Sequence, residues 1–145
     1  MLRMRFLHTM LRVRDLDAAL AFWCDALGFV EMRRNVVEAG RFTLVFLRAP
    51  GDAPGSAEIE LTFNWDQAEP YDGGRNFGHV AVAVDDIQAA CARLQAHGVT
   101  ILRPPRDGHM AFVRSPDAQS VELLQRGGAL SPVEPWLSMP NTGVW

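Results

Sequence analysis

The sequence predicts an α+β protein built from two βαβββ modules, and three observations carry this prediction. The first is an internal repeat in which His79 follows His8 at an offset of 71 residues and the match continues without a gap. The second is the alternation of apolar and polar residues around each histidine, which is typical of a strand. The third is an aspartate, Asp15 or Asp86, that precedes an apolar stripe and therefore marks the start of a helix in each copy.

Each predicted helix carries apolar residues at positions i, i+3, i+4 and i+7, as a helix packed on a core requires. These residues are Leu16, Ala19, Leu20 and Trp23 in the first copy and Ile87, Ala90, Cys91 and Leu94 in the second. Gly28 and Gly98 end the two helices, since glycine readily adopts the left-handed conformation just past a helix. Three β-like stretches then follow in each copy, at 29–35, 41–48 and 57–64 and at 99–102, 109–114 and 120–125.

Polar residues and glycines at 66–76 separate the two copies. The predicted organisation is a first module at 1–65, a linker at 66–76, a second module at 77–126 and a tail at 127–145. The tail fits neither copy, and its prolines predict an extended segment that holds Trp136 and Trp145. Three roles stay open for it: closing over a pocket, lying across a dimer, or adding only stability.

The composition is that of a soluble globular chain, with 48% hydrophobic and 21% charged residues. A net charge of −3 and scattered arginines argue against a nucleic-acid partner. The longest apolar run, Ala18 to Cys24, is too short to span a membrane, and arginines near the start interrupt any signal-peptide core. Cys24 and Cys91 lie among apolar residues and are predicted to be reduced core thiols, so we expect a cytoplasmic protein.

Two glutamates stand where an apolar residue would suit a strand better, Glu60 in EIELTFNW and Glu122 in SVELL. Period-two alternation places each glutamate opposite its apolar neighbours, and it places His8 and His79 in the same way. Each copy thus offers one histidine on its first strand and one glutamate on its last. If those strands are neighbours and the two sheets face each other, the four side chains predict a catalytic site for a divalent metal such as Zn, Ni, Co or Fe.

Each of these four residues taken alone has an ordinary explanation. A single strand histidine is usually hydrogen-bonded in the core or at the surface, and a single strand glutamate usually faces water. The repeat favours the metal hypothesis, because two unrelated accidents would have to recur at matching places. His97 and His109 have no repeat partner. His97 is predicted to be structural or to face solvent at a helix end, whereas His109 either faces solvent or lines the pocket.

Four segments, FLHTMLRVRDLDAALAFW, EIELTFNW, FGHVAVAV and AFVRSPDAQSVELL, resemble the glyoxalase I (lactoylglutathione lyase) family of the vicinal oxygen chelate superfamily. The resemblance implies the paired-module fold and the metal ligands His8, Glu60, His79 and Glu122, which are the four that the repeat selects. It also implies a homodimer in which modules of different subunits complete each site. One divalent ion per site is expected, with Ni or Co favoured over Zn as in the short bacterial form.

The resemblance further implies a reaction, the isomerisation of the hemithioacetal of glutathione and methylglyoxal to S-lactoylglutathione through an ene-diolate. Glu122 would be the base that moves the proton from C1 to C2, and Glu60 the second catalytic carboxylate. Family positions that bind the carboxylates of the substrate fall on Arg12, Asn64, Arg75 and Arg106. The metal loaded in the cell and the thiol used, glutathione or another, stay open.

Two alternatives also remain open, another vicinal oxygen chelate enzyme (an epimerase, a dioxygenase or a thiol transferase) and a metal-free small-molecule-binding module. A glutamate at position 60 favours glyoxalase, and the presence of all four ligands disfavours the metal-free module. The sequence departs from the family in one turn, where Ser115-Pro116-Asp117-Ala118-Gln119 replaces an Asp-Pro-Asp-Gly turn and an aromatic residue. Ala118 is expected to strain this turn if its φ is positive.

Overall fold

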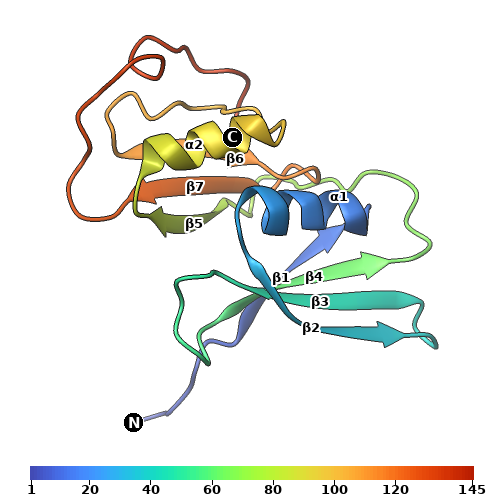
Figure 1. Cartoon of the computed structure of the whole chain (residues 1–145). Coiled ribbons are helices and arrows are strands. Elements are labelled where there is room, and N and C mark those ends of the chain that lie inside the picture. The colour runs from blue at the N-terminus through green and yellow to red at the C-terminus, as the bar shows by residue number, and fades with distance from the viewer. The chain divides into compact units, whose positions relative to one another are not determined.

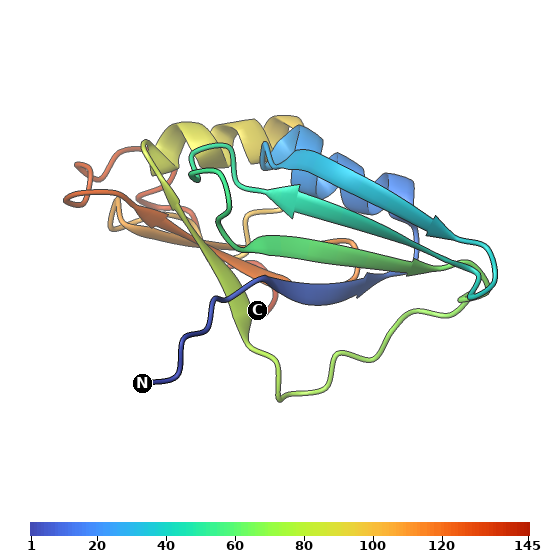
Figure 2. The ribbon, with the colours of Figure 1, turned by 90° about the horizontal axis from the view of Figure 1, so that it is seen from below.

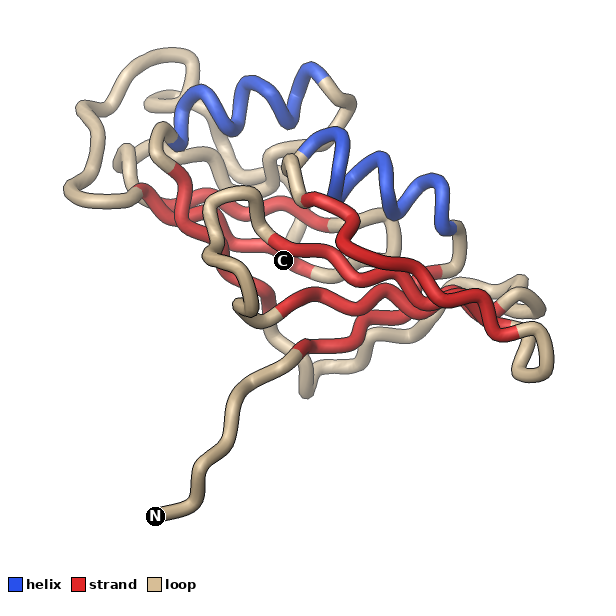
Figure 3. Tube along the Cα trace, turned by 60° about the horizontal axis from the view of Figure 1, so that its bottom comes forward, coloured by secondary structure: helices blue, strands red, loops and turns tan.

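The computed structural model describes residues 1–145 and divides the chain into two compact units, Met1–Tyr71 and Asp72–Trp145. The division falls inside the segment predicted as a linker. Each unit has its own β-sheet and its own helical segment, which lies over one face of that sheet (Figures 1 and 3). None of the helices has both the length and the apolar character that crossing a membrane demands.

The first unit contains a four-stranded sheet with the order β1-β4-β3-β2 (Figure 2). Its strands are β1 (His8–Val13), β2 (Val30–Val37), β3 (Phe42–Arg48) and β4 (Glu58–Asn64). Strands β1 and β4 pair in parallel, and the other neighbours pair antiparallel. The first and last strands of the unit are therefore side by side, which is the arrangement that the predicted site needs.

The helical segment of the first unit begins as predicted but changes its winding. Asp15 caps α1 (Leu16–Leu20) by accepting a hydrogen bond from the amide of Ala18 at 3.0 Å. The chain then continues as a π-helix, η1 (Ala21–Ala26), so the expectation of one uninterrupted α-helix is wrong. The wider turn buries Phe22 and Trp23 together, and the Trp23 ring packs edge-on against Phe22 with centroids 5.3 Å apart.

The second unit contains a three-stranded sheet with the order β5-β7-β6. Its strands are β5 (His79–Val84), β6 (Met110–Arg114) and β7 (Ser120–Gln125), and α2 (Ile87–Ala96) follows β5. Strands β5 and β7 pair in parallel, so the first and last strands are again neighbours. Asp86 caps α2 by accepting from the amide of Ala89 at 2.9 Å, in the way that Asp15 caps α1.

The strand expected at 99–102 is absent, and this prediction is wrong. Only an isolated bridge between Arg103 and Phe112 joins this part of the chain to β6. Two causes are visible. Pro104 and Pro105 follow directly and have no amide hydrogen to donate to a ladder. In addition, the carbonyl of Leu102 accepts a hydrogen bond from the amide of Thr142 at 2.8 Å. The tail thus occupies a carbonyl that would otherwise bond to a neighbouring strand.

Helix α2 packs its apolar side into the core of the second unit, where Ile87, Cys91 and Leu94 are buried. Burial raises the pKa of the Cys91 thiol to about 12. Burial, together with the charges of Glu31 and Asp25, also raises the pKa of the Cys24 thiol. Neither cysteine forms a disulfide. Both thiols are therefore protonated at neutral pH. Cys91 is a core residue as predicted, whereas Cys24 is only partly buried.

The tail is held against the second unit by a series of hydrogen bonds. The amide of Leu130 donates to the carbonyl of Gly108 at 2.9 Å, and the side chain of Gln88 donates to the carbonyl of Ser131 at 2.9 Å. Further along, the guanidinium of Arg106 donates to the carbonyl of Met139 at 3.0 Å. Trp136 is buried. The tail is thus a fixed part of this unit.

The turn before β7 holds Ala118 at a φ of +62°, so the strain expected from alanine in a glycine position is present. The hydroxyl oxygen of Ser115 accepts hydrogen bonds from the amides of Asp117 at 3.2 Å and Gln119 at 3.1 Å. The carbonyl of Ser115 accepts from the amide of Ala118 at 2.9 Å. These bonds keep the turn closed in spite of the unfavourable backbone conformation.

We expect the substitution Ala118→Gly to stabilise the protein. The left-handed region costs an L-residue about 1–2 kcal/mol, and the greater freedom of glycine in the unfolded chain offsets about 0.4–1 kcal/mol of this. The free energy of unfolding, measured by urea titration, should rise by about 0.5–1 kcal/mol. Ala92→Gly, on the exposed side of α2, is the control and should lower it by a similar amount. A loss of stability in Ala118→Gly would contradict the strain.

Candidate active site

The first candidate pair joins β1 to β4. In the parallel ladder, His8 lies beside Glu58 and Met10 lies beside Glu60. Glu60 therefore lies on the same face of the sheet as His8, two residues further along the neighbouring strand. The Nε2 atom of His8 is 2.7 Å from Oε2 of Glu60. The histidine side chain is 39% exposed and that of the glutamate 12%. A solvent-accessible imidazole thus contacts a largely buried carboxylate.

The second candidate pair repeats this arrangement on β5 and β7. His79 lies beside Ser120 and Ala81 beside Glu122, so the histidine and glutamate have the same register as the first pair. The Nε2 atom of His79 is 3.8 Å from Oε1 of Glu122, which is longer than a hydrogen bond. The two side chains are 43% and 15% exposed. No third histidine, cysteine or acidic residue joins either pair.

Each pair lies on the face of its sheet that the helix leaves open. On the opposite face of the first sheet, Leu11, Val45 and Leu61 are buried with the helical segment, and Val113, Val121 and Leu123 are buried in the same way in the second unit. Imidazole nitrogen and carboxylate oxygen are ordinary ligands of divalent transition metals. The donor atoms of both pairs therefore fit such an ion.

Each histidine also packs against a phenylalanine that lies opposite the glutamate in the sheet. Phe46 pairs with Glu60, and its ring meets the His8 ring edge-on with centroids 5.7 Å apart. Phe112 pairs with Glu122 and meets His79 edge-on at 5.4 Å. Such contacts restrict how each imidazole turns. Phe46 and Phe112 were not predicted to be site residues, although the shared pattern of Phe, an apolar residue and Arg at 46–48 and 112–114 signals them.

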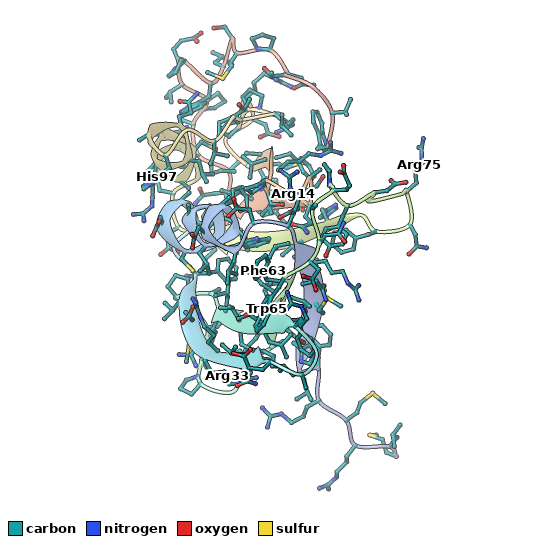
Figure 4. All side chains as sticks on the ribbon, turned by 90° about the vertical axis from the view of Figure 1, so that its right-hand side faces the viewer. Arg14, Arg33, Phe63, Trp65, Arg75 and His97 are labelled. Carbon is teal, nitrogen blue, oxygen red and sulfur yellow. The ribbon has the colours of Figure 1, made fainter.

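The ring of Phe46 is covered on its outer side by Arg33 from β2, the strand on which Figure 4 labels this residue. The guanidinium carbon lies 3.8 Å from the ring centroid. The same guanidinium donates to both carboxylate oxygens of Glu58, at 2.8 and 3.1 Å. Arg33 is 52% exposed, and its guanidinium also braces the ring beside His8.

The chain matches a model of the Glyoxalase/Bleomycin resistance protein/Dioxygenase superfamily over residues 5–123. It belongs to this superfamily. It is 42% identical over 135 residues to a probable lactoylglutathione lyase of Vibrio parahaemolyticus, covering 90% of this chain and 96% of the relative. It is 44% identical over 128 residues to a lactoylglutathione lyase of Neisseria meningitidis, with coverages of 85% and 91%. A solved structure of the trypanothione-dependent glyoxalase I of Leishmania major has a TM-score of 0.78 at 37% identity, covering 85% of this chain and 87% of that one.

These matches confirm the α+β glyoxalase fold and the family resemblance that the repeat and the motifs predict. The tail of this glyoxalase-superfamily chain, 127–145, lies outside the matched range of the superfamily model. The features that the tail adds to the second unit are therefore additional to the superfamily core.

Two of the four predicted substrate residues of this glyoxalase-superfamily chain lie on the face that carries the first pair. Arg12 is exposed on β1, beside Thr62 of β4. Asn64 ends β4, and its side-chain oxygen accepts from the hydroxyl of Tyr71 at 3.4 Å. Both side chains lie further along the two strands that hold His8 and Glu60. The structure thus groups Arg12 and Asn64 with the first pair.

The other two predicted substrate residues lie outside the strands. Arg75 is exposed on the segment between β4 and β5, and Figure 4 shows its side chain pointing outward from the tip of that segment. Arg106 lies in the turn before β6 and is held by its hydrogen bond to Met139. The structure brings neither of them into direct contact with His79 or Glu122.

The remaining two histidines face solvent. His97 ends α2 and is exposed, as predicted, and Figure 4 shows its side chain projecting from the helix end. His109 is exposed just before β6. Its amide donates to Oδ1 of Asp107 at 2.9 Å. Of the two possibilities left open for His109, the structure favours the solvent-facing one.

Asp107 organises the turn that leads into β6. Partial burial alone would raise the pKa of its carboxyl group, but hydrogen bonds from the Arg103 guanidinium and from the amides of His109 and Met110 outweigh burial and hold that pKa well below its usual value. Arg103 also donates a hydrogen bond to the carbonyl of Met110. This network keeps Asp107 ionised and fixes the start of β6, the strand that carries Phe112.

Proposed function

We propose that this chain is a lactoylglutathione lyase that isomerises the hemithioacetal of glutathione and methylglyoxal to S-lactoylglutathione. The observation that carries the proposal is the histidine–glutamate pair that recurs in the same strand register on the open face of both sheets. Relatives 42% and 44% identical to this chain, and aligned over nearly their whole length, bear the name of this activity.

His8, Glu60, His79 and Glu122 would hold one divalent metal ion, with Ni or Co favoured over Zn. Two imidazole nitrogens and two carboxylate oxygens are donors that suit these metals. When bound, such an ion supplies Lewis-acid polarisation of the substrate oxygens. The chain itself supplies the orientation of the ligands, since Phe46 and Phe112 pack edge-on against the two imidazoles.

Glu122 is the residue that moves the proton from C1 to C2 of the hemithioacetal. Its nearest approach to His79 is 3.8 Å, so no hydrogen bond to the imidazole ties up its carboxylate. Glu60, by contrast, lies 2.7 Å from the Nε2 atom of His8. This difference favours Glu122 as the base and leaves Glu60 as the second carboxylate of the site.

The carboxylates of glutathione would bind to the predicted substrate residues, Arg12, Asn64, Arg75 and Arg106. The grouping of Arg12 and Asn64 beside the first pair supports this role for both. A guanidinium has five donors, so the bond from Arg106 to Met139 leaves others for a carboxylate. Arg75 lies on an exposed segment. Its contact with the substrate would depend on how the two subunits of the proposed dimer assemble.

The direct test is thioester formation from methylglyoxal and a thiol by the purified chain, after metal removal and addition of Ni, Co or Zn separately. We expect turnover with glutathione, fastest with Ni or Co. Trypanothione is the second thiol in the assay, because the Leishmania major relative depends on it. The absorbance of the thioester measures the rate. Absence of turnover with every metal and both thiols would refute the proposal.

We also propose that the active protein is a homodimer in which His8 and Glu60 of one subunit complete a site with His79 and Glu122 of the other. Subunit mixing tests this arrangement. One variant carries His8→Ala and Glu60→Gln, and the other carries His79→Ala and Glu122→Gln. Each is expected to be inactive alone, because every site then lacks two ligands.

Refolding the two variants together in equal amounts gives mixed dimers with one intact site, so about a quarter of the wild-type activity should return. The comparison is a mixture of the same variants that is never unfolded, which should stay inactive while the dimers do not exchange. If all four ligands of a site come from a single subunit, the refolded mixture stays inactive, and this outcome would exclude the shared site.

A further inference from the structure

Trp145 lies on the same face of the second sheet as the His79 and Glu122 pair. Its ring stacks on Phe112 with centroids 5.5 Å apart and planes 18° apart. The same Phe112 ring meets His79 edge-on and lies beside Glu122 in the ladder. Histidine, phenylalanine and tryptophan thus form a continuous row, and the tryptophan is separated from a candidate metal ligand by one ring.

The position of Trp145 is fixed by the tail that carries it. Three residues earlier, the amide of Thr142 donates to the carbonyl of Leu102 at 2.8 Å. An added methyl group at Gly143 would lie 3.6 Å from the side chain of Leu102, which is ordinary packing distance. Trp145 is nevertheless 40% exposed, so the stack leaves part of its apolar surface accessible.

The corresponding place in the first unit has a different chemistry. There the phenylalanine beside the histidine, Phe46, is covered by the guanidinium of Arg33, which is paired with Glu58. The second unit has no strand equivalent to β2, because 99–102 forms no strand and only the following Arg103 bridges to Phe112. The tail supplies the covering group there. One half of the repeat therefore presents an ion pair next to its ligands, and the other half presents an indole.

We propose that Trp145 is a substrate-contacting residue that binds the uncharged substituent of the 2-oxoaldehyde and gives the enzyme a preference for apolar or aromatic substituents. This inference rests on the proposed function. The charged ends of glutathione require cations or amides, which an indole and a phenyl ring do not offer. The uncharged substituent sits next to the reacting carbons, and those carbons must lie near Glu122. The exposed indole one ring away matches that substituent in place and in polarity.

The test compares methylglyoxal with phenylglyoxal, each as its glutathione hemithioacetal, in Trp145→Ala, Trp145→Phe and wild type. We expect Trp145→Ala to lower kcat/KM for the phenylglyoxal adduct by about 3- to 10-fold relative to the methylglyoxal adduct, the factor that one aromatic contact gives. Trp145→Phe should restore most of the preference. Val144→Ala, at an exposed neighbour that makes no ring stack, is the matched control and should leave the ratio unchanged.

A merely structural tryptophan would change the rates for both adducts by the same factor, and an unchanged ratio in Trp145→Ala would overturn the inference. Binding of S-benzylglutathione provides a second readout that needs no turnover. Its quenching of tryptophan fluorescence should be smaller in Trp145→Phe than in wild type, and equal quenching would also count against the inference. Turnover by the wild type tests the proposed function separately, because it does not depend on either variant.

Discussion

Replacing Glu122 by glutamine is expected to lower kcat by ~10² to ~10⁴, the contribution of a well-placed general base. The amide keeps the shape of the carboxylate but does not accept the proton from C1. Because glutamine has nearly the same shape and Glu122 makes no hydrogen bond to His79, the folded protein should survive the change. Steady-state kinetics in the best metal gives the rate, and urea unfolding checks the fold.

The chain offers a matched control in Glu58→Gln. Glu58 lies on the same face of β4 as Glu60 and next to His8, yet its counterpart in the repeat is Ser120, so it is not part of the duplicated set. Its loss should leave kcat within about 3-fold of wild type, while Glu60→Gln should abolish turnover as Glu122→Gln does. Full activity in both ligand variants would remove the two carboxylates from the mechanism.

The second large effect is expected for Gly108→Ala, which should destabilise the protein by about 2–4 kcal/mol. Gly108 has a φ of +69°, and a Cβ atom there would lie 1.9 Å from the carbonyl oxygen of Leu130. This oxygen belongs to the backbone, so the tail must move away. The movement also breaks the hydrogen bond from the Leu130 amide to Gly108. Chemical denaturation measures the loss.

Gly127→Ala separates the two causes of that loss. Gly127 has nearly the same φ, +72°, but an added Cβ meets nothing within 4 Å. Its substitution should therefore cost only the net backbone penalty of about 0.5–1 kcal/mol. The difference between the two variants measures how firmly the tail is attached. Equal losses of stability would mean that the tail can move at no cost in free energy. This result would weaken the proposal that Trp145 is held in position to contact the substrate.

The sequence predicts those parts of the site that depend on local periodicity. Alternation along a strand decides on which face Glu60 and Glu122 lie, and the repeat assigns His8 and His79 to matching strands. Both features are properties of short segments. The structure agrees with the strand register that these predictions require, since each histidine and its glutamate lie on neighbouring parallel strands.

Features that depend on contacts between distant segments could not be predicted in this way. The strand expected at 99–102 is absent, and one of the two causes is that the tail, some forty residues later, bonds to Leu102. The π-helix buries Phe22 and Trp23 together, which a stripe of period 3.6 does not indicate. The stacking of Trp145 on Phe112 and the packing of Arg33 on Phe46 likewise arise only when separate strands come together.

The pairing of the first strand of each unit with its last strand has a consequence for the newborn chain. Fifty-two residues separate His8 from Glu60, and forty-three separate His79 from Glu122. Contacts so remote along the polypeptide form late, since the intervening chain must be ordered first. The histidine and the glutamate of each unit, which are proposed metal ligands, therefore come together only after the last strand of that unit has been synthesised and paired.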